Sequence, residues 1–216
     1  MKNQNFILML ILVLFFACEP FVTKFNDIED AVLYQSIDKS PLPTDQSYIK
    51  VMTWNIRFGA GRTPWKYDSC GDRVLLTDQE IQGNLNQIVD FINTMDTIPD
   101  ILILQEIDVL SKRSGYIDQV QWILDNTHFN YGAYASMWQA QFIPNDGLGM
   151  VDVGNAILSR WNINNAERIQ LPLRADQSSM EQYFYLRRNI LKTKINIDLI
   201  LSSFYVVGTH TTAFAT

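Results

Sequence analysis

The amino-acid sequence predicts an α/β fold. Residues 49–55 alternate apolar with polar or smaller side chains and are rich in β-branched and aromatic types, which is typical of a strand. Residues 78–95 carry apolar side chains at helical spacing, and residues 100–104 form an apolar run too short for a helix. Strand, long loop, helix and strand follow the order of a βαβ unit. We therefore expect the strands that end at Asn55 and Glu106 to be neighbours.

Composition and charge restrict the classes of protein that are possible. The chain has 216 residues, of which 47% are hydrophobic and 19% are charged, enough for a real core in one large or two small domains. Its net charge of −6 leaves no basic excess to hold nucleic acid by counterion release. This argues against nonspecific DNA binding, although an enzyme can keep one local positive groove.

Residues 1–18 are predicted to be a targeting segment. Lys2 precedes an apolar run from Phe6 to Ala17, which is too short to span a bilayer but suits a signal peptide. The run ends in Phe-Phe-Ala-Cys, which resembles a bacterial lipoprotein signal with Cys18 as the lipidated residue. Lipidation would tether the mature protein to a membrane. The alternatives are an ordinary secretory signal, with Cys18 as a bystander, and an uncleaved anchor.

Residues 19–47 contain three prolines and more acids than lysines, so we expect a weakly ordered linker with one short helix near residues 28–36. Beyond this segment Cys70 is the only cysteine, which excludes a disulfide within the domain. A nucleophilic role for Cys70 would need a histidine partner. We expect a buried or half-buried loop thiol instead.

The remaining elements follow from periodicity and turn residues. Thr77 and Glu80 match a capping box, which supports the helix at 78–95. Its apolar face is expected to hold Ile81, Leu85, Ile88, Val89, Ile92 and Met95. The other predicted elements are a helix at 115–126, a strand at 131–137, a loop at 139–152, an extended segment at 153–160 and a strand pair at 187–195 and 199–208.

Three polar residues share one position relative to the predicted strands. Asn55, Glu106 and His210 each follow an apolar strand by the same short step. If these strands belong to one sheet or sandwich, the three side chains project from the same rim, where chemistry collects in sheet proteins. An amide beside a carboxylate suits a hard divalent cation, which prefers oxygen ligands.

Four ordered motifs carry a resemblance to a known family. They are Thr-Trp-Asn-Ile-Arg ending at Arg57, Leu-Gln-Glu ending at Glu106, the segment 154–160, and Gly-Thr-His ending at His210. Together they resemble the endonuclease/exonuclease/phosphatase superfamily, which includes deoxyribonucleases, abasic-site endonucleases, sphingomyelinases and inositol polyphosphate phosphatases. The resemblance covers residues 48–216. It implies a four-layer α/β sandwich, in which two mostly antiparallel sheets face each other and helices lie outside.

The resemblance also implies roles for individual residues. Glu106 matches the main Mg²⁺ ligand, and Asn55 matches its neighbour in the metal and phosphate site, where Mn²⁺ could replace Mg²⁺. His210 matches the histidine that stabilises phosphate charge, and Arg188 matches a phosphate-contacting arginine. Gly208 departs from the usual Asn-Thr-His of the family. The segment from Asn155 is expected to be structural support first and a substrate contact second.

The expected protein is a Mg²⁺-dependent phosphodiester hydrolase, anchored as a lipoprotein in the bacterial cell envelope, periplasmic or at the surface. Its substrate would be a lipid headgroup, a small phosphodiester or nucleic acid, and the acidic balance and the anchor favour the first two. No protein partner is expected. The alternative from another class is a non-catalytic binding lipoprotein that keeps the fold.

The resemblance further implies an Asp-x-Asn pair and a Ser-Asp-His that position and deprotonate the attacking water. Neither motif follows His210, and the only other histidine, His128, lacks that context. Residues 48–216 are therefore expected to be the N-terminal part of the family's domain, incomplete at the C-terminal side and inactive as a fragment. General-base help alone is typically worth about 10²–10⁴ in rate.

Overall fold

The computed structural model describes residues 24–44, 47–68, 70–197 and 202–211. The predicted signal peptide at 1–18, with Cys18, lies outside these ranges. Within them, no helix is long and apolar enough to cross a membrane. The predicted linker at residues 19–47 lies partly inside these ranges.

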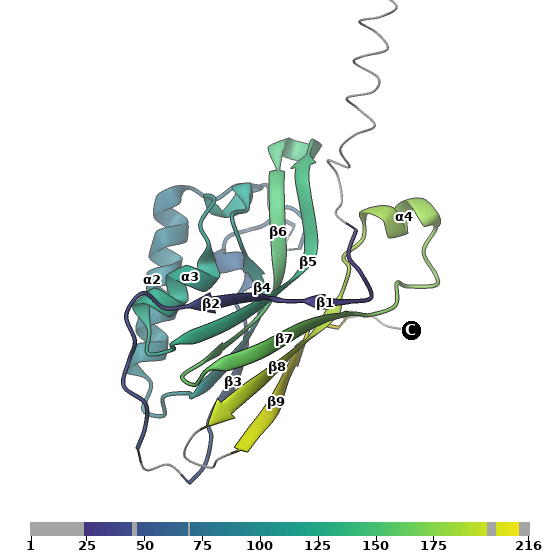
Figure 1. The fold of residues 1–216 in the computed structure, drawn as a ribbon. Helices are drawn as coiled ribbons and strands as arrows, with labels where there is room; N and C mark the ends of the chain where they lie inside the picture. The colour runs from purple at the N-terminus through teal and green to yellow at the C-terminus, as the bar shows by residue number, and fades with distance from the viewer. Residues whose placement is uncertain (1–23, 45–46, 69, 198–201, 212–216) are drawn as a thin grey trace, which may run out of the picture.

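Two mostly antiparallel sheets form a sheet-rich α/β fold (Figure 1). The five-stranded sheet has the order β2 (Val32–Gln35), β5 (Tyr131–Ile143), β6 (Gly149–Ser159), β4 (Ile101–Asp108), β3 (Val51–Asn55). The four-stranded sheet has the order β1 (Ile28–Asp30), β7 (Ile163–Gln170), β8 (Asn189–Ile197), β9 (Ser202–Thr209). Among the strands that the structure describes, only β3 and β4 pair in parallel, and this pairing confirms that the strands ending near Asn55 and Glu106 are neighbours.

Three α-helices are found among the described residues. They are α2 (Asp78–Thr94), α3 (Gln119–Asn126) and α4 (Ser179–Phe184), with 3₁₀ turns η1 (Arg57–Gly59), η2 (Lys112–Ser114) and η3 (Asn145–Gly147). Helices α2 and α3 pack on one face of the five-stranded sheet, and the four-stranded sheet packs on its other face. The described residues thus form three layers: helices, sheet and sheet.

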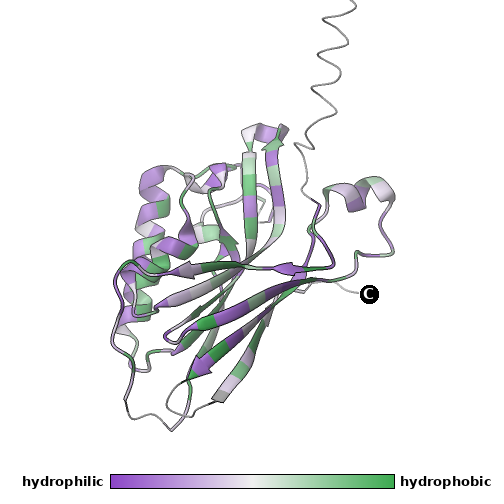
Figure 2. Cartoon of the chain, in the orientation of Figure 1, coloured by the Kyte–Doolittle hydropathy of each residue, from purple (hydrophilic) through white to green (hydrophobic). Residues whose placement is uncertain are grey.

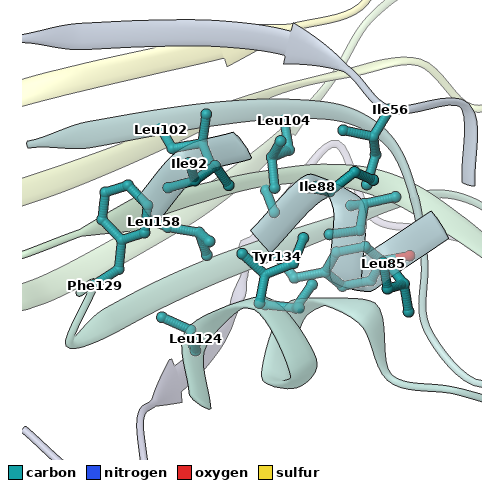
Figure 3. Packing of buried hydrophobic residues seen from close by; sticks show 14 of the residues in the cluster. Ile56, Leu85, Ile88, Ile92, Leu102, Leu104, Leu124, Phe129, Tyr134 and Leu158 are labelled. Atoms are coloured by element: carbon teal, nitrogen blue, oxygen red, sulfur yellow. The ribbon is translucent and has the colours of Figure 1, made fainter. Parts of the chain in front are cut away.

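Helix α2 confirms the helix predicted at residues 78–95 and ends one residue earlier, at Thr94. The Thr77 side chain accepts from the Glu80 amide and the Glu80 carboxylate accepts from the Thr77 amide, so both halves of the capping box are present. Hydrophobic and hydrophilic residues alternate around this helix (Figure 2). Leu85, Ile88 and Ile92 lie in one buried cluster with Leu102 and Leu104 of β4 (Figure 3). Each such side chain contributes about 1.5–3 kcal/mol by leaving water.

A second core fills the space between the sheets. Ile101, Ala133 and Ile157 of the five-stranded sheet meet Leu191 and Ile195 of the four-stranded sheet, and all five are buried. Strands that are buried on both faces, such as β4 and β6, carry nearly continuous apolar runs for this reason.

The expectation for residues 28–36 is wrong. They form no helix, and residues 28–35 are not a free linker: β1 pairs with β7 and β2 pairs with β5. Between them the amide of Ala31 donates to the carbonyl of Ala166 (2.9 Å). The segment therefore adds an edge strand to each sheet. Its strands exist because of distant backbone partners, which local composition does not reveal.

Other boundaries also differ from the prediction. The expected loop at 139–152 is wrong, because β5 and β6 extend into a long hairpin whose turn is only residues 144–148. Helix α3 begins at Gln119, where Asp118 caps it, and not at Gly115, which adopts a left-handed conformation. Strand β7 and helix α4 were not expected. The C-terminal strand pair is confirmed with slightly shifted bounds, and its connection at 198–201 lies outside the described residues.

Candidate functional site

Strands β3 and β4 bring two predicted site residues to one edge of the five-stranded sheet. The strands are parallel and Asn55 lies opposite Gln105, so both strands end at the same edge. Asn55 on β3 is therefore offset by one residue from Glu106 on β4. The Asn55 Nδ2 donates to the Glu106 Oε1 at 3.0 Å. The parallel register is the direct cause of this contact.

A β-bulge determines how Glu106 is presented. The register between β4 and β6 shifts between Gln105 and Ile107, and Glu106 has a φ of +52°. A non-glycine residue in the left-handed region costs about 1–2 kcal/mol, and bulges often redirect side chains beside functional sites. Leu104 and Ile107, which flank the pair Gln105-Glu106, are fully buried, whereas the exposed fraction of the Glu106 side chain is 30%. The bulge thus turns one carboxylate out of a buried strand.

The loop after β3 holds the Asn55 amide in one orientation. The backbone N–H of Arg57 donates to the Asn55 Oδ1 at 2.9 Å, which leaves Nδ2 to face Glu106. Arg57 is itself in the left-handed region, with a φ of +48°. Its guanidinium donates to both carboxylate oxygens of Asp68 and to the carbonyl of Gly61. The Asp68 hydrogen bond raises the pKa of Arg57, so this loop is held by a permanent cation.

His210 reaches the same place from the other sheet. It follows β9, and its Nε2 lies 3.7 Å from the Glu106 Oε1. Arg188 Nη1 donates to the backbone carbonyl of His210 at 2.8 Å. Burial, and then the nearby Arg188, lower the pKa of His210, while Glu106 acts in the opposite direction. The ring is thus neutral at pH 7. Its Nδ1 is buried and has no hydrogen-bond partner among the described residues.

Gly208, where the resembling family carries an asparagine, has a packing explanation. A Cβ at this position would lie 2.8 Å from the Ile103 Cγ2 of β4. The two sheets therefore approach closely just before His210, and only glycine fits without movement of Ile103. This approach places the end of β9 over the end of β4. Position 208, where the sequence differs from the resembling family, is thus one at which the backbone of β9 must pass close to β4.

The Asn155 segment lies beneath these residues. Asn155 is fully buried, and its Nδ2 donates to the Asn189 Oδ1 at 3.1 Å, which links β6 to β8. Asn189 in turn donates to the carbonyl of Ser136. This amide pair connects the two sheets and matches the expected structural role. Sequence reasoning missed Asn189, although its place beside Arg188 and its polarity inside a strand were visible signals.

Two other polar residues lie elsewhere. His128 is half-buried, with its Nε2 2.6 Å from the carbonyl of Pro99, at the opposite end of β4 from Glu106. Burial lowers its pKa. Cys70 is exposed, so the expectation of a buried or half-buried thiol is wrong. Its loop is held by backbone hydrogen bonds between the segments around Trp65 and Arg73, which leave the thiol on the surface.

The donor set restricts the kind of metal that could bind. Within the described parts of the chain, no group of three or more His, Cys, Asp or Glu residues could hold a metal. A structural zinc site, which needs four protein ligands, is therefore not formed by these residues. Mg²⁺ keeps several waters and often uses one or two carboxylates. The Glu106 carboxylate, with Asn55 beside it, fits that smaller requirement.

No family model, no curated protein and no solved structure matches this chain significantly. The chemistry that the site can perform is therefore defined by its own residues. They provide a half-exposed carboxylate on a strained bulge, an amide that orients it, a neutral imidazole and a nearby guanidinium.

Proposed function

We propose that the chain carries a Mg²⁺-dependent phosphoester hydrolase site of the endonuclease/exonuclease/phosphatase type. The observation that supports it is the meeting of Asn55, Glu106 and His210 from three strands in two sheets. Asn55 ends β3, Glu106 lies two residues before the end of β4, and His210 follows β9. These three residues lie far apart in the sequence. They meet because the strands that carry them reach one rim of the fold. The proposal includes a four-layer sandwich, with helices outside both sheets, and attachment to the bacterial envelope through Cys18.

In this proposal each residue has a distinct task. Glu106 would hold Mg²⁺ or Mn²⁺, which when bound supplies positive charge to the phosphate oxygens, and Asn55 lies beside Glu106 with its Nδ2 toward the carboxylate and its Oδ1 held by the Arg57 amide. Asn55 also orients the Glu106 carboxylate through its hydrogen bond. The neutral His210 ring directs an N–H at a non-bridging oxygen, where a preorganised donor stabilises developing charge. Arg188 positions the end of β9 through the His210 carbonyl and adds a cation beside the phosphate.

Turnover is expected to be slow for this set of residues. His128, the chain's second histidine, is held by Pro99 at the far end of β4 and cannot act on a water near Glu106. A positioned general base is typically worth about 10²–10⁴ in rate. Metal binding is therefore a more direct test than hydrolysis.

The proposal is tested by titrating the full 216-residue chain, in mild detergent, with Mn²⁺ and following free Mn²⁺ by electron paramagnetic resonance. Glu106→Gln keeps the shape but removes the charge, so it should weaken Mn²⁺ binding about tenfold or more. Glu167→Gln is the matched control, because the exposed fractions of the two side chains are 30% and 32%. Glu167 lies on β7 and pairs with Lys192.

Equal Mn²⁺ affinity in the Glu106→Gln and Glu167→Gln variants would show that Glu106 is not a metal ligand. Release of nitrophenol from bis(p-nitrophenyl) phosphate is measured on the same samples. Mn²⁺ binding that depends on Glu106, with no release above background, would favour the alternative of a non-catalytic binding lipoprotein.

A further inference from the structure

A cleft opens beside the candidate site, between the end of β3, the loop after it and helix α2. Its volume is about 620 Å³, within the range of pockets that bind small molecules. Asn55 and Arg57 line it at one end, and Phe91 of α2 lies in its wall. Asn55 is shared by the two regions, because it lines the cleft and its Nδ2 donates to the Glu106 Oε1. A phosphate at Glu106 could therefore extend its ester group into this space.

Two aromatic side chains form part of the wall. Trp54 comes from β3 and Phe91 from α2, and their ring centroids are 5.4 Å apart at an angle of 67°. This edge-to-face packing holds each ring in place. Phe91 is 50% exposed, so it still presents ring surface to the cleft. Aromatic surface of this kind stacks planar rings such as nucleobases, by about 1–3 kcal/mol for each base.

Two polar side chains of the cleft have no partner among the described residues. Arg62 and Gln87 are exposed and make no hydrogen bond or ion pair there. In contrast, Asn84 in the same cleft donates to the carbonyl of Gly59 (2.8 Å). An arginine fork suits a phosphate, and an amide can both donate to and accept from the polar edge of a base. These two groups differ from their neighbours in being available to a ligand.

We propose that this cleft is a subsite for a planar ring carried on the phosphate, of the size and polarity of a nucleobase. The ring would stack on Phe91, with Gln87 at its polar edge and Arg62 near a phosphate. A nucleotide unit uses the aromatic wall and both polar groups, whereas a choline headgroup or an acyl chain offers Gln87 no hydrogen-bond partner. The proposal rests on the proposed function, because it takes the phosphate to lie at Glu106.

The test measures binding without turnover and without metal. The full chain, in detergent with EDTA, is titrated with thymidine 5′-monophosphate, phenyl phosphate or glycerol 3-phosphate, followed by saturation-transfer NMR. Glycerol 3-phosphate has neither a ring nor a quaternary ammonium, which would itself bind an aromatic face. The ring-bearing phosphates should therefore bind about tenfold more tightly than glycerol 3-phosphate, since only they stack. Phe91→Ala should remove that difference and leave glycerol 3-phosphate binding unchanged.

The control is Tyr205→Ala. Tyr205 is an aromatic residue of similar exposure, 59%, on β9 in the other sheet, next to Lys192. This variant should bind all three ligands like the parent chain. Phe91→Leu is a second variant that keeps apolar bulk in the cleft. It should lose the preference for rings as Phe91→Ala does, because it lacks a flat face, and circular dichroism checks that both variants keep α2.

The outcomes separate the two proposals. Equal binding of glycerol 3-phosphate and the ring-bearing phosphates, or a ring preference that survives Phe91→Ala, would overturn the subsite and leave the Mn²⁺ result untouched. A ring preference together with Mn²⁺ binding that ignores Glu106→Gln would overturn the hydrolase proposal and support the subsite. Tighter binding of the thymidine ligand than of phenyl phosphate would identify a nucleobase. Equal binding of these two would identify a general aryl subsite.

Discussion

Glu106 and Asp108 lie two residues apart on β4, yet they belong to opposite kinds of polar cluster. Asp108 is fully buried and accepts from Arg113 Nε (2.9 Å), Arg113 Nη2 (2.7 Å) and Ser114 Oγ (2.8 Å). The Arg113 guanidinium also lies 3.8 Å from the centre of the Phe58 ring. Glu106 is half-exposed, and only its Oε1 accepts a hydrogen bond from a described residue.

The difference indicates that the Asp108 cluster stabilises this end of β4, whereas the Glu106 cluster does not. The Asp108 cluster satisfies each carboxylate oxygen and fastens η2 to β4. The Glu106 cluster leaves the Oε2 of Glu106 and the buried Nδ1 of His210 without a hydrogen-bond partner in the described part of the chain, and the Glu106 backbone is in the left-handed region. Strain and unsatisfied groups of this kind collect at functional sites. Three predictions test this contrast.

The largest effect is expected for Asp108→Asn. The substitution keeps the shape but leaves the Arg113 guanidinium, only 9% exposed, without its counter-charge. Breaking a buried pair in this way typically costs about 3–5 kcal/mol, which urea denaturation would measure. Glu167→Gln, which breaks an exposed pair with Lys192, should cost no more than about 1 kcal/mol. Similar losses in both variants would contradict a special structural role for Asp108.

A smaller effect, of opposite sign, is expected for Glu106→Gly. Glycine relieves the left-handed strain of about 1–2 kcal/mol, and the lost Asn55 hydrogen bond and greater unfolded-state freedom offset part of it. We expect a net gain of roughly 0.5–1 kcal/mol in the free energy of unfolding, together with loss of Mn²⁺ binding. Glu106→Gln, which keeps the strain, is the matched control. A less stable glycine variant would mean that the bulge is not strained.

The smallest effect is a pH dependence from the histidines. Burial is the main cause of the lowered pKa of both His128 and His210, whose ordinary value is 6.5. The unfolded chain therefore binds protons more readily than the folded chain just below pH 6.5. The neutral histidines therefore contribute fully to the free energy of unfolding above pH 6.5. This contribution falls as the pH drops below 6.5 toward their lower pKa values in the folded chain.

This dependence can be measured from urea midpoints at pH 7.5 and 5.5. The difference should be smaller in His210→Gln than in the parent chain, because one group that resists protonation has been removed. Imidazole NMR signals should titrate below pH 6.5. A His210 signal that titrates at or above 6.5 would show that Glu106 outweighs burial at the site.

Local sequence was sufficient for part of the fold. The capping box at Thr77 and Glu80 and the apolar stripe behind it determine α2, because helix signals lie within a few residues of one another. The apolar runs that end at Asn55 and Glu106 determine β3 and β4, and their pairing as neighbours follows from the βαβ order, with α2 as the crossover. The residues of the candidate site were therefore visible as strand-end polar groups, although their roles remain proposals.

Tertiary structure alone decided the rest. Residues 28–35 become strands only through partners near residues 131–134 and 167–169, and β7 is too polar to be recognised without its neighbours. The bulge at Glu106 depends on register with β6, and the approach of His210 depends on Gly208 passing Ile103. Helix signals are local, whereas strand pairing, register and the meeting of sheets are set by backbone groups far apart in the chain.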